Sequence, residues 1–163
     1  MSYFRLKHNT INSIIEQVQE AVAGTVFSNL TILRAYSNVY AKDVKLPFMV
    51  ISLESTSSDY FQIGDTNFQK DMLIIFDIYA KNEVYKEDLS DFLVEELIKH
   101  NFKYYEYSYI SGTDKDLDKV QNGELIFINL ISDVSVVFNE FENNEKDQHR
   151  HRISFILRRF PNV

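Results

Sequence analysis

The sequence contains no cysteine, no tryptophan, four glycines and two prolines among its 163 residues. The absence of cysteine excludes disulfides, thiol nucleophiles and cysteine-ligated zinc or iron–sulfur sites. The glycines lie at least eleven residues apart, so they cannot build a glycine-rich phosphate-binding loop. No apolar run is long enough to span a bilayer, and the charged residues among the first eight do not fit a signal peptide. We expect a protein that is soluble and cytosolic when made.

What the chain does contain is typical of a folded domain. Its length suits a single domain over residues 1–163 with a sizeable core, and 45% of the residues are hydrophobic and 25% charged. Phenylalanine and tyrosine are abundant, with 13 and 10 copies. Because aromatic side chains favour pleated, half-buried surfaces, strands should be plentiful.

The net charge of −7 is unevenly distributed along the chain. Residues 1–81 carry a net charge of −1, residues 82–147 carry −10, and residues 148–163 carry +4. The overall sign disfavours non-specific binding to DNA phosphates. Since the acidic and basic blocks belong to one molecule, head-to-tail contact between copies is one way to satisfy both.

The spacing of apolar residues predicts an α+β fold. The expected elements are a helix over 9–24, strands over 30–36, 48–54 and 67–80, a helix over 82–99, an aromatic strand over 102–110, and strands over 124–140 and 149–160. Asn9 or Thr10 is the expected N-cap of the first helix, and Gly24 its stop. Polar connections are expected over 55–64, from 111 to about 123, and over 142–148. We expect a mainly antiparallel sheet with the N-terminal and central helices packed on it, plus a long C-terminal β-hairpin.

Two histidines form the pattern closest to a metal site. His149 and His151 alternate on a predicted strand, so both imidazoles should project to the same side. Arg150 and Arg152 flank them and would oppose a cation, and a third ligand would have to come from elsewhere. We therefore expect both histidines on an exposed face beside acidic neighbours, with no metal and no cofactor.

Two aspartates on the predicted strand 67–80 resemble the carboxylates of metal-dependent nucleases. Asp71 and Asp77 are six residues apart, hence on one face but roughly 20 Å from each other by strand rise. They cannot share one ion, so we expect solvent-facing acids. The tyrosines of strand 102–110 lack the basic groove of a base-stacking platform, and core packing or a protein interface is the expected use.

Three segments together resemble one protein family. Leu46–Ile51 is a Pro-led strand, Asp59–Asp65 a polar loop, and Asp71–Lys81 a long strand ending in Tyr-Ala-Lys before an acidic amphipathic helix. In this order the chain resembles the tail terminator, or tail completion, proteins of long-tailed bacteriophages. The likeness covers roughly residues 9–100 and continues loosely through the terminal strands.

The resemblance implies a structural virion protein without enzymatic activity, assembled in the host cytoplasm. Such a protein forms a hexameric ring on the last tail-tube ring, stops tube polymerisation and joins the tail to the head or neck, and DNA passes through its lumen. The first candidates for ring or tube contacts are four of the six arginines with the two neighbouring histidines: Arg150, Arg152, Arg158, Arg159, His149 and His151.

Other interpretations stay open at this point. The same basic residues could form a solvated strand face. A related neck or head-completion connector would share much of the pattern. From other classes, the chain could be a metal-dependent phosphodiesterase or nuclease using Asp71, Asp77 or the two histidines, or a small module that binds a peptide through an exposed sheet edge.

Overall fold

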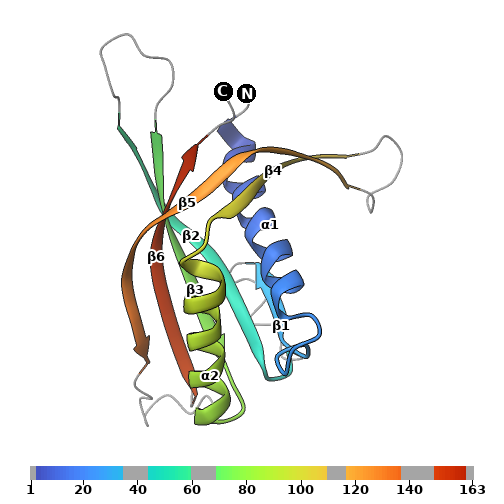
Figure 1. Ribbon diagram of the computed structural model, residues 1–163, viewed down its shortest axis with the longest axis vertical. Helices are drawn as coiled ribbons and strands as arrows, with labels where there is room; N and C mark the ends of the chain where they lie inside the picture. Colours follow the sequence, from blue (N-terminus) through green and yellow to red (C-terminus); the bar gives the residue numbers. More distant parts are fainter. Residues whose placement is uncertain (1–2, 35–43, 60–68, 110–116, 137–148, 161–163) are drawn as a thin grey trace.

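The computed structural model describes residues 3–34, 44–59, 69–109, 117–136 and 149–160, and shows a mixed α/β, broadly α+β, architecture (Figure 1). The helical elements are α1 (Tyr3–Val22), α2 (Glu83–Leu93) and a π-helical turn η2 (Val94–Ile98) that continues α2. The strands are β1 (Thr31–Arg34), β2 (Phe48–Asp59), β3 (Gln69–Tyr79), β4 (Phe102–Tyr109), β5 (Leu117–Ser135) and β6 (Arg150–Phe160).

The six strands form one sheet in the order β1-β2-β3-β6-β5-β4. Among the described strands, the β1–β2 pair is parallel and the other four pairs are antiparallel. The last strand in the sequence therefore lies inside the sheet, between β3 and β5. Without β6, the β1-β2-β3 group and the β4-β5 pair have no strand in common.

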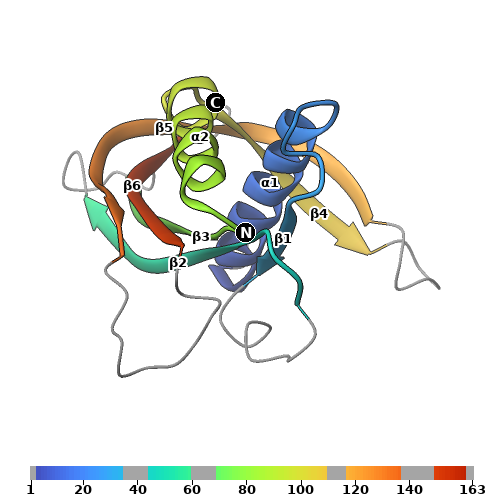
Figure 2. The same ribbon diagram turned by 90° about the horizontal axis from the view of Figure 1, so that it is seen from below.

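Both helices share one hydrophobic core with one face of the sheet. Figure 2 shows the sheet curled around α1 and α2. The core contains Ile14 and Val18 of α1 and Leu89 of α2, together with alternate residues of the central strands. The core residues from β3 and β6 are Met72, Ile74, Phe76, Ile78, Ile153, Phe155 and Leu157. Because strand side chains alternate between faces, this buried set fixes which residues of β3 and β6 point away from the helices.

Helix α1 begins earlier than its sequence predicts. It starts at Tyr3, so the expected cap at Asn9 or Thr10 is wrong. Both residues are buried inside the helix, and the Thr10 hydroxyl donates to Met72 Sδ at 3.6 Å. Short polar residues resemble a cap in sequence, but here packing against β3 places them on the buried face. Gly24, with φ of 75°, follows the helix as expected.

Two strands are longer than predicted. Strand β2 continues to Asp59, past a bulge between Leu53 and Ser55, because β3 provides a partner along its whole length. Strand β5 begins at Leu117, where a charged loop was expected, because β4 pairs with it from Tyr109 back to Phe102. In both cases pairing outweighs the polar composition of the segment. The polar turn predicted over 142–148 lies outside the described residues.

Side chains of α1 cover the outer edge of β4. The backbone N–H of Lys103 donates to Gln17 Oε1 at 2.8 Å, and Gln17 Nε2 donates to the Lys103 carbonyl at 2.8 Å. The N–H of Tyr105 donates to Ser13 Oγ at 2.9 Å. These bonds replace a neighbouring strand, which blunts an edge that would otherwise accept another chain.

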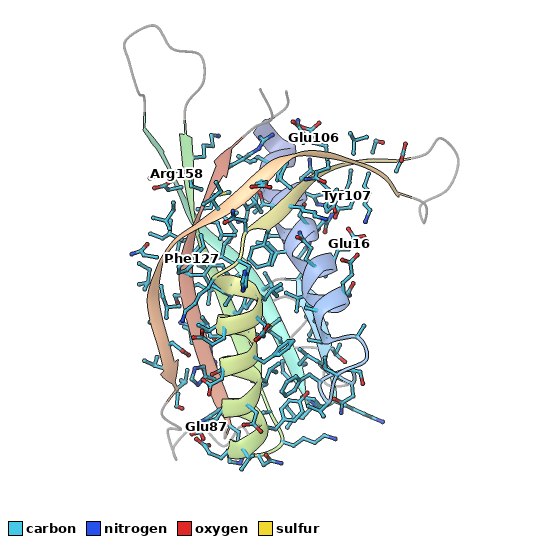
Figure 3. The ribbon with its side chains drawn as sticks, viewed as in Figure 1. Glu16, Glu87, Glu106, Tyr107, Phe127 and Arg158 are labelled. Atoms are coloured by element: carbon cyan, nitrogen blue, oxygen red, sulfur yellow. The ribbon has the colours of Figure 1, made fainter. Side chains whose placement is uncertain are left out.

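A second contact on the same helix fixes its distance from the sheet. Tyr107 of β4 and Glu16 of α1 point toward one another (Figure 3), and the phenol donates to Glu16 Oε2 at 2.7 Å. Lys119 of β5 also pairs with Glu16 and lies 4.7 Å from the Tyr105 ring centroid. Burial and the Glu16 carboxylate raise the pKa of the Tyr107 phenol, which stays protonated as this hydrogen bond requires.

Helix α2 begins at a side-chain cap, since Asn82 Oδ1 accepts from the backbone N–H of Tyr85 at 2.8 Å. We expect Asn82→Ala to lower the free energy of unfolding by about 1 kcal/mol, because it leaves that N–H without its acceptor. Asn82→Ser, which retains a capping oxygen, should lose much less. Urea denaturation of the three proteins checks this, and equal losses for both substitutions would contradict the capping role.

Candidate functional site

The basic terminal strand faces acidic residues of β3 inside the same chain. On the face of the sheet away from the helices, the register sets Arg152 opposite Asp77 and Arg158 opposite Asp71. This register is imposed by the apolar residues on the other face, since a slip by one residue would expose them. The basic strand therefore meets acids of β3, which lie outside the acidic block of residues 82–147, across one strand pair.

Asp77 is the most deeply buried of these acids, with a side-chain exposure of 1%. The Arg152 guanidinium donates to both carboxylate oxygens, from Nε at 2.8 Å and from NH2 at 2.9 Å. A second guanidinium, that of Arg150, lies 3.3 Å from Asp77 Oδ1 and 5.2 Å from the Tyr79 ring centroid. The expectation of a solvent-facing acid is wrong for Asp77, because two arginines offset the cost of burying its charge.

Asp71 forms the matching pair at the other end of β3. Arg158 donates to it from Nε at 2.6 Å and from NH2 at 2.8 Å, and Figure 3 shows Arg158 at the outer side of the sheet. These hydrogen bonds hold the pKa of the Asp71 carboxyl below its ordinary value, against the opposing effect of partial burial. The two aspartates thus lie at separate arginines and do not converge on one ion.

The pKa of Asp71 predicts how its pair responds to acid. Because the folded pKa lies below the unfolded one, the stabilisation is complete above the unfolded pKa and is lost as pH falls through the folded pKa. We expect the difference in unfolding free energy between wild type and Asp71→Asn to shrink between neutral pH and about pH 3. Urea titrations at several pH values measure it, and a constant difference would contradict the assignment.

The remaining candidates lie nearer the helices. Arg159 is buried, with Cζ 4.1 Å from the Tyr104 ring centroid and NH2 3.8 Å from Glu106 Oε1. His151 is also buried and pairs with Asp133 of β5, so the exposed position expected for it is wrong. The face of β6 that carries His151 and Arg159 is continuous with the core. These polar residues at the two ends of the face are therefore buried with it.

His149, which directly precedes β6, pairs with a different acid. Its Nδ1 lies 3.2 Å from Glu83 Oε2 at the start of α2, and Glu83 also pairs with Lys86. The two histidines therefore have separate acidic partners. Among the described residues, no three His, Asp or Glu side chains gather as metal ligands would.

Each of the six predicted contact residues has an acidic partner within its own chain. The charge complementarity that the sequence offered for contact between copies is thus used inside the subunit. It joins β6 to β3, β4 and β5, and the residue before β6 to α2. An interface built on this strand would have to share arginines that already hold carboxylates.

Sequence reasoning missed a surface on β5. Besides Val120, four large apolar side chains in the second half of this strand are exposed: Ile128, Leu130, Ile131 and Val134. A signal was present, because residues 125–132 form a run without any charge and with apolar residues at successive positions. Successive residues of a strand cannot all face one core, so part of such a run must be covered from the other side or left exposed.

No protein-family model matches the chain, and no curated protein matches it. Of the helices that the structure describes, none has the length and apolar composition needed to cross a membrane. The chemistry of the described residues is therefore the basis for a function: cross-strand ion pairs, a helix-covered strand edge and an exposed apolar strand.

Proposed function

We propose that the protein is a structural virion protein that forms a hexameric ring at the end of the tail tube of a long-tailed phage. It ends tube polymerisation and joins the tail to the head or neck. The observation that carries the proposal is the continuity of the segments that resemble this family. The Pro-led strand and the long strand pair as β2 and β3, and α2 follows directly.

The charge distribution fits a channel for DNA. Six acids of the α2–η2 unit are exposed: Glu83, Glu87, Asp88, Asp91, Glu95 and Glu96. Figure 3 shows Glu87 near the lower end of α2, where the helix begins. The arginines that would attract phosphates are instead paired with carboxylates. A wall that carries such acids lets DNA slide past without binding it.

The proposal includes a specific role for the C-terminal strands. Strands β5 and β6 pair antiparallel from Glu124–Phe160 to Ser135–His151. In this proposal they act with their connection as a long C-terminal hairpin, and the two helices brace the sheet from its concave side. The ion pairs of β6 with Asp77 and Asp71 then tie the hairpin to β3.

Mass measurement tests the proposal. Purified protein is expected to form a ring of defined mass, and to cap tubes assembled from tail-tube subunits so that they stop growing. A protein that stays monomeric, alone and with tube subunits, would contradict the proposal. A ring that never caps tubes would instead favour a neck or head-completion connector, the alternative within the same class.

A further inference from the structure

Strand β5 contains the one asparagine of the sequence that is followed by glycine, Asn122 before Gly123. In such a pair the backbone nitrogen of the glycine can attack the side-chain amide carbon of the asparagine, because the glycine has no side chain to hinder the approach. The attack requires the peptide between the two residues to rotate, and regular ladder hydrogen bonds resist that rotation. The reactivity of the pair therefore depends on how β5 is held at these two positions.

The pairing of β5 is interrupted on both sides at this point. Toward β4, the register shifts between Lys103 and Tyr105, so Tyr104 alone lies opposite the two residues Asn122 and Gly123. Such a bulge leaves part of the strand out of the ladder. Toward β6, the described pairing of β5 begins only after the glycine. Among the described residues, neither neighbouring strand is therefore in register with β5 at the asparagine and the glycine.

The backbone of Gly123 favours rotation of the same peptide. Its φ is 100°, a value that side chains with a Cβ rarely allow. Glycine populates positive and negative φ about equally readily, so the peptide between Asn122 and Gly123 can turn over without a steric clash. The rotation carries the Gly123 nitrogen toward Asn122 Cγ. Asn122 is only partly buried, so water reaches its side chain.

The Asn122 side chain also contacts a carboxylate. Its Nδ2 donates to Glu106 Oε1 of β4 at 2.9 Å, and Arg159 NH2 lies 3.8 Å from the same oxygen. An amide at this position is a neutral donor beside a negative charge. A carboxylate in its place has no proton to donate at neutral pH and repels Glu106, because like charges on neighbouring strands are destabilising.

We propose that Asn122 is a site of spontaneous deamidation in the folded protein, and that the product replaces the hydrogen bond to Glu106 with a like-charge contact. The Gly123 nitrogen forms a bond to Asn122 Cγ, the Cγ–Nδ2 bond breaks, and ammonia leaves with the Gly123 amide proton. Water then opens the resulting succinimide: its hydroxyl adds to one of the two ring carbonyl carbons and its proton to the nitrogen, which gives aspartate or isoaspartate. The reaction needs no enzyme and is independent of the proposed ring.

Peptide mapping by mass spectrometry tests the first part of the proposal. The full chain is incubated at mildly alkaline pH, folded in buffer and unfolded in guanidinium chloride, and the product is recognised because it is heavier by the mass of water less that of ammonia. We expect the folded protein to convert Asn122 at a rate within about tenfold of the unfolded chain, because little structure has to open for the peptide to rotate. A folded-state rate lower than this would show that the sheet protects the pair, and would overturn the proposal.

The same strand provides an internal control. Asn129 is more exposed than Asn122 and also lies beside a register shift, but Leu130 follows it. We expect conversion at Asn122 to be at least about tenfold faster than at Asn129, because a Cβ confines φ and hinders the attack. Equal rates would mean that Gly123 has no special role. Asn122→Gln retains an amide but has to close a larger ring, and it should abolish the conversion at this position.

Urea denaturation tests the second part of the proposal. Asn122→Asp supplies the aspartate product directly, and we expect its unfolding midpoint to lie below that of wild type by an amount that shrinks at high salt. Combining it with Glu106→Gln removes the opposing charge and should restore most of the loss. A midpoint for Asn122→Asp equal to that of wild type, or no recovery in the double variant, would overturn the like-charge contact.

Discussion

Asp77→Ala is expected to lower the free energy of unfolding by about 3 kcal/mol. The substitution removes a carboxylate that is 1% exposed and that accepts two hydrogen bonds from Arg152. It also removes the carboxylate that both the Arg150 and the Arg152 guanidiniums contact. Breaking a buried pair by deleting one member costs more than the pair itself contributes, because the remaining charge stays desolvated.

Asp71→Ala is the matched control for this prediction. Asp71 lies on the same strand and accepts the same bidentate pair of hydrogen bonds, but its side chain is 20% exposed, compared with 1% for Asp77. We expect a loss of about 1 kcal/mol, as for partly exposed ion pairs. Urea denaturation monitored by circular dichroism measures both losses. Equal losses at the two positions would show that burial does not set the strength of these pairs.

Phe155→Ala is expected to lower the free energy of unfolding by about 4 kcal/mol, which is more than we expect for either aspartate substitution. Phe155 of β6 is fully buried and meets the Phe76 ring of β3 edge to face, with centroids 5.0 Å apart. Truncation removes this contact and leaves a cavity in the centre of the sheet, between both helices and the middle strands.

The neighbouring residue provides the comparison. Ile156 pairs with Leu73 on the face away from the helices and is only partly buried. Ile156→Ala should therefore lower the free energy of unfolding by about 1 kcal/mol. Thermal and urea unfolding of the two variants test the register of the central strands directly. A larger loss at Ile156 than at Phe155 would mean that β6 presents the opposite face to the core.

Local patterns in the sequence were sufficient for several elements. The alternation of apolar residues over 67–80 predicted β3, and the helical spacing from Leu89 to Leu97 predicted the α2–η2 unit. Gly24 predicted the end of α1, since a glycine with positive φ is a common helix stop. These features depend on residues close together in the chain.

Features that depend on distant pairing were not predictable in the same way. The surroundings of Asp77 follow from its register with β6, a strand 75 residues away in sequence. The early start of β5 follows from its pairing with β4, and the buried positions of Asn9 and Thr10 follow from packing on the sheet. In each case a polar residue was expected in solvent or at a helix cap, because composition alone does not reveal its partner.

The bulges of β5 mark the same limit for its exposed aliphatic residues. An uncharged run is visible in the sequence, but which of its residues face outward depends on where the ladder with β6 shifts. Alternation alone would put Ile126, Ile128 and Leu130 on one face. The structure separates them, since Ile128 is an extra residue and Leu130 lies opposite Phe155.

The central place of β6 has a consequence for synthesis on the ribosome. Chains are made from the N-terminus, and the strands before β6 emerge as two groups, β1-β2-β3 and β4-β5, that share no ladder. Until residues 150–160 leave the exit tunnel, the facing edges of β3 and β5 have no partner in the sheet. A nascent chain that stalls before this point would expose both edges together with the uncovered core. The addition of β6 to the sheet is therefore the folding step that protects the subunit from aggregation.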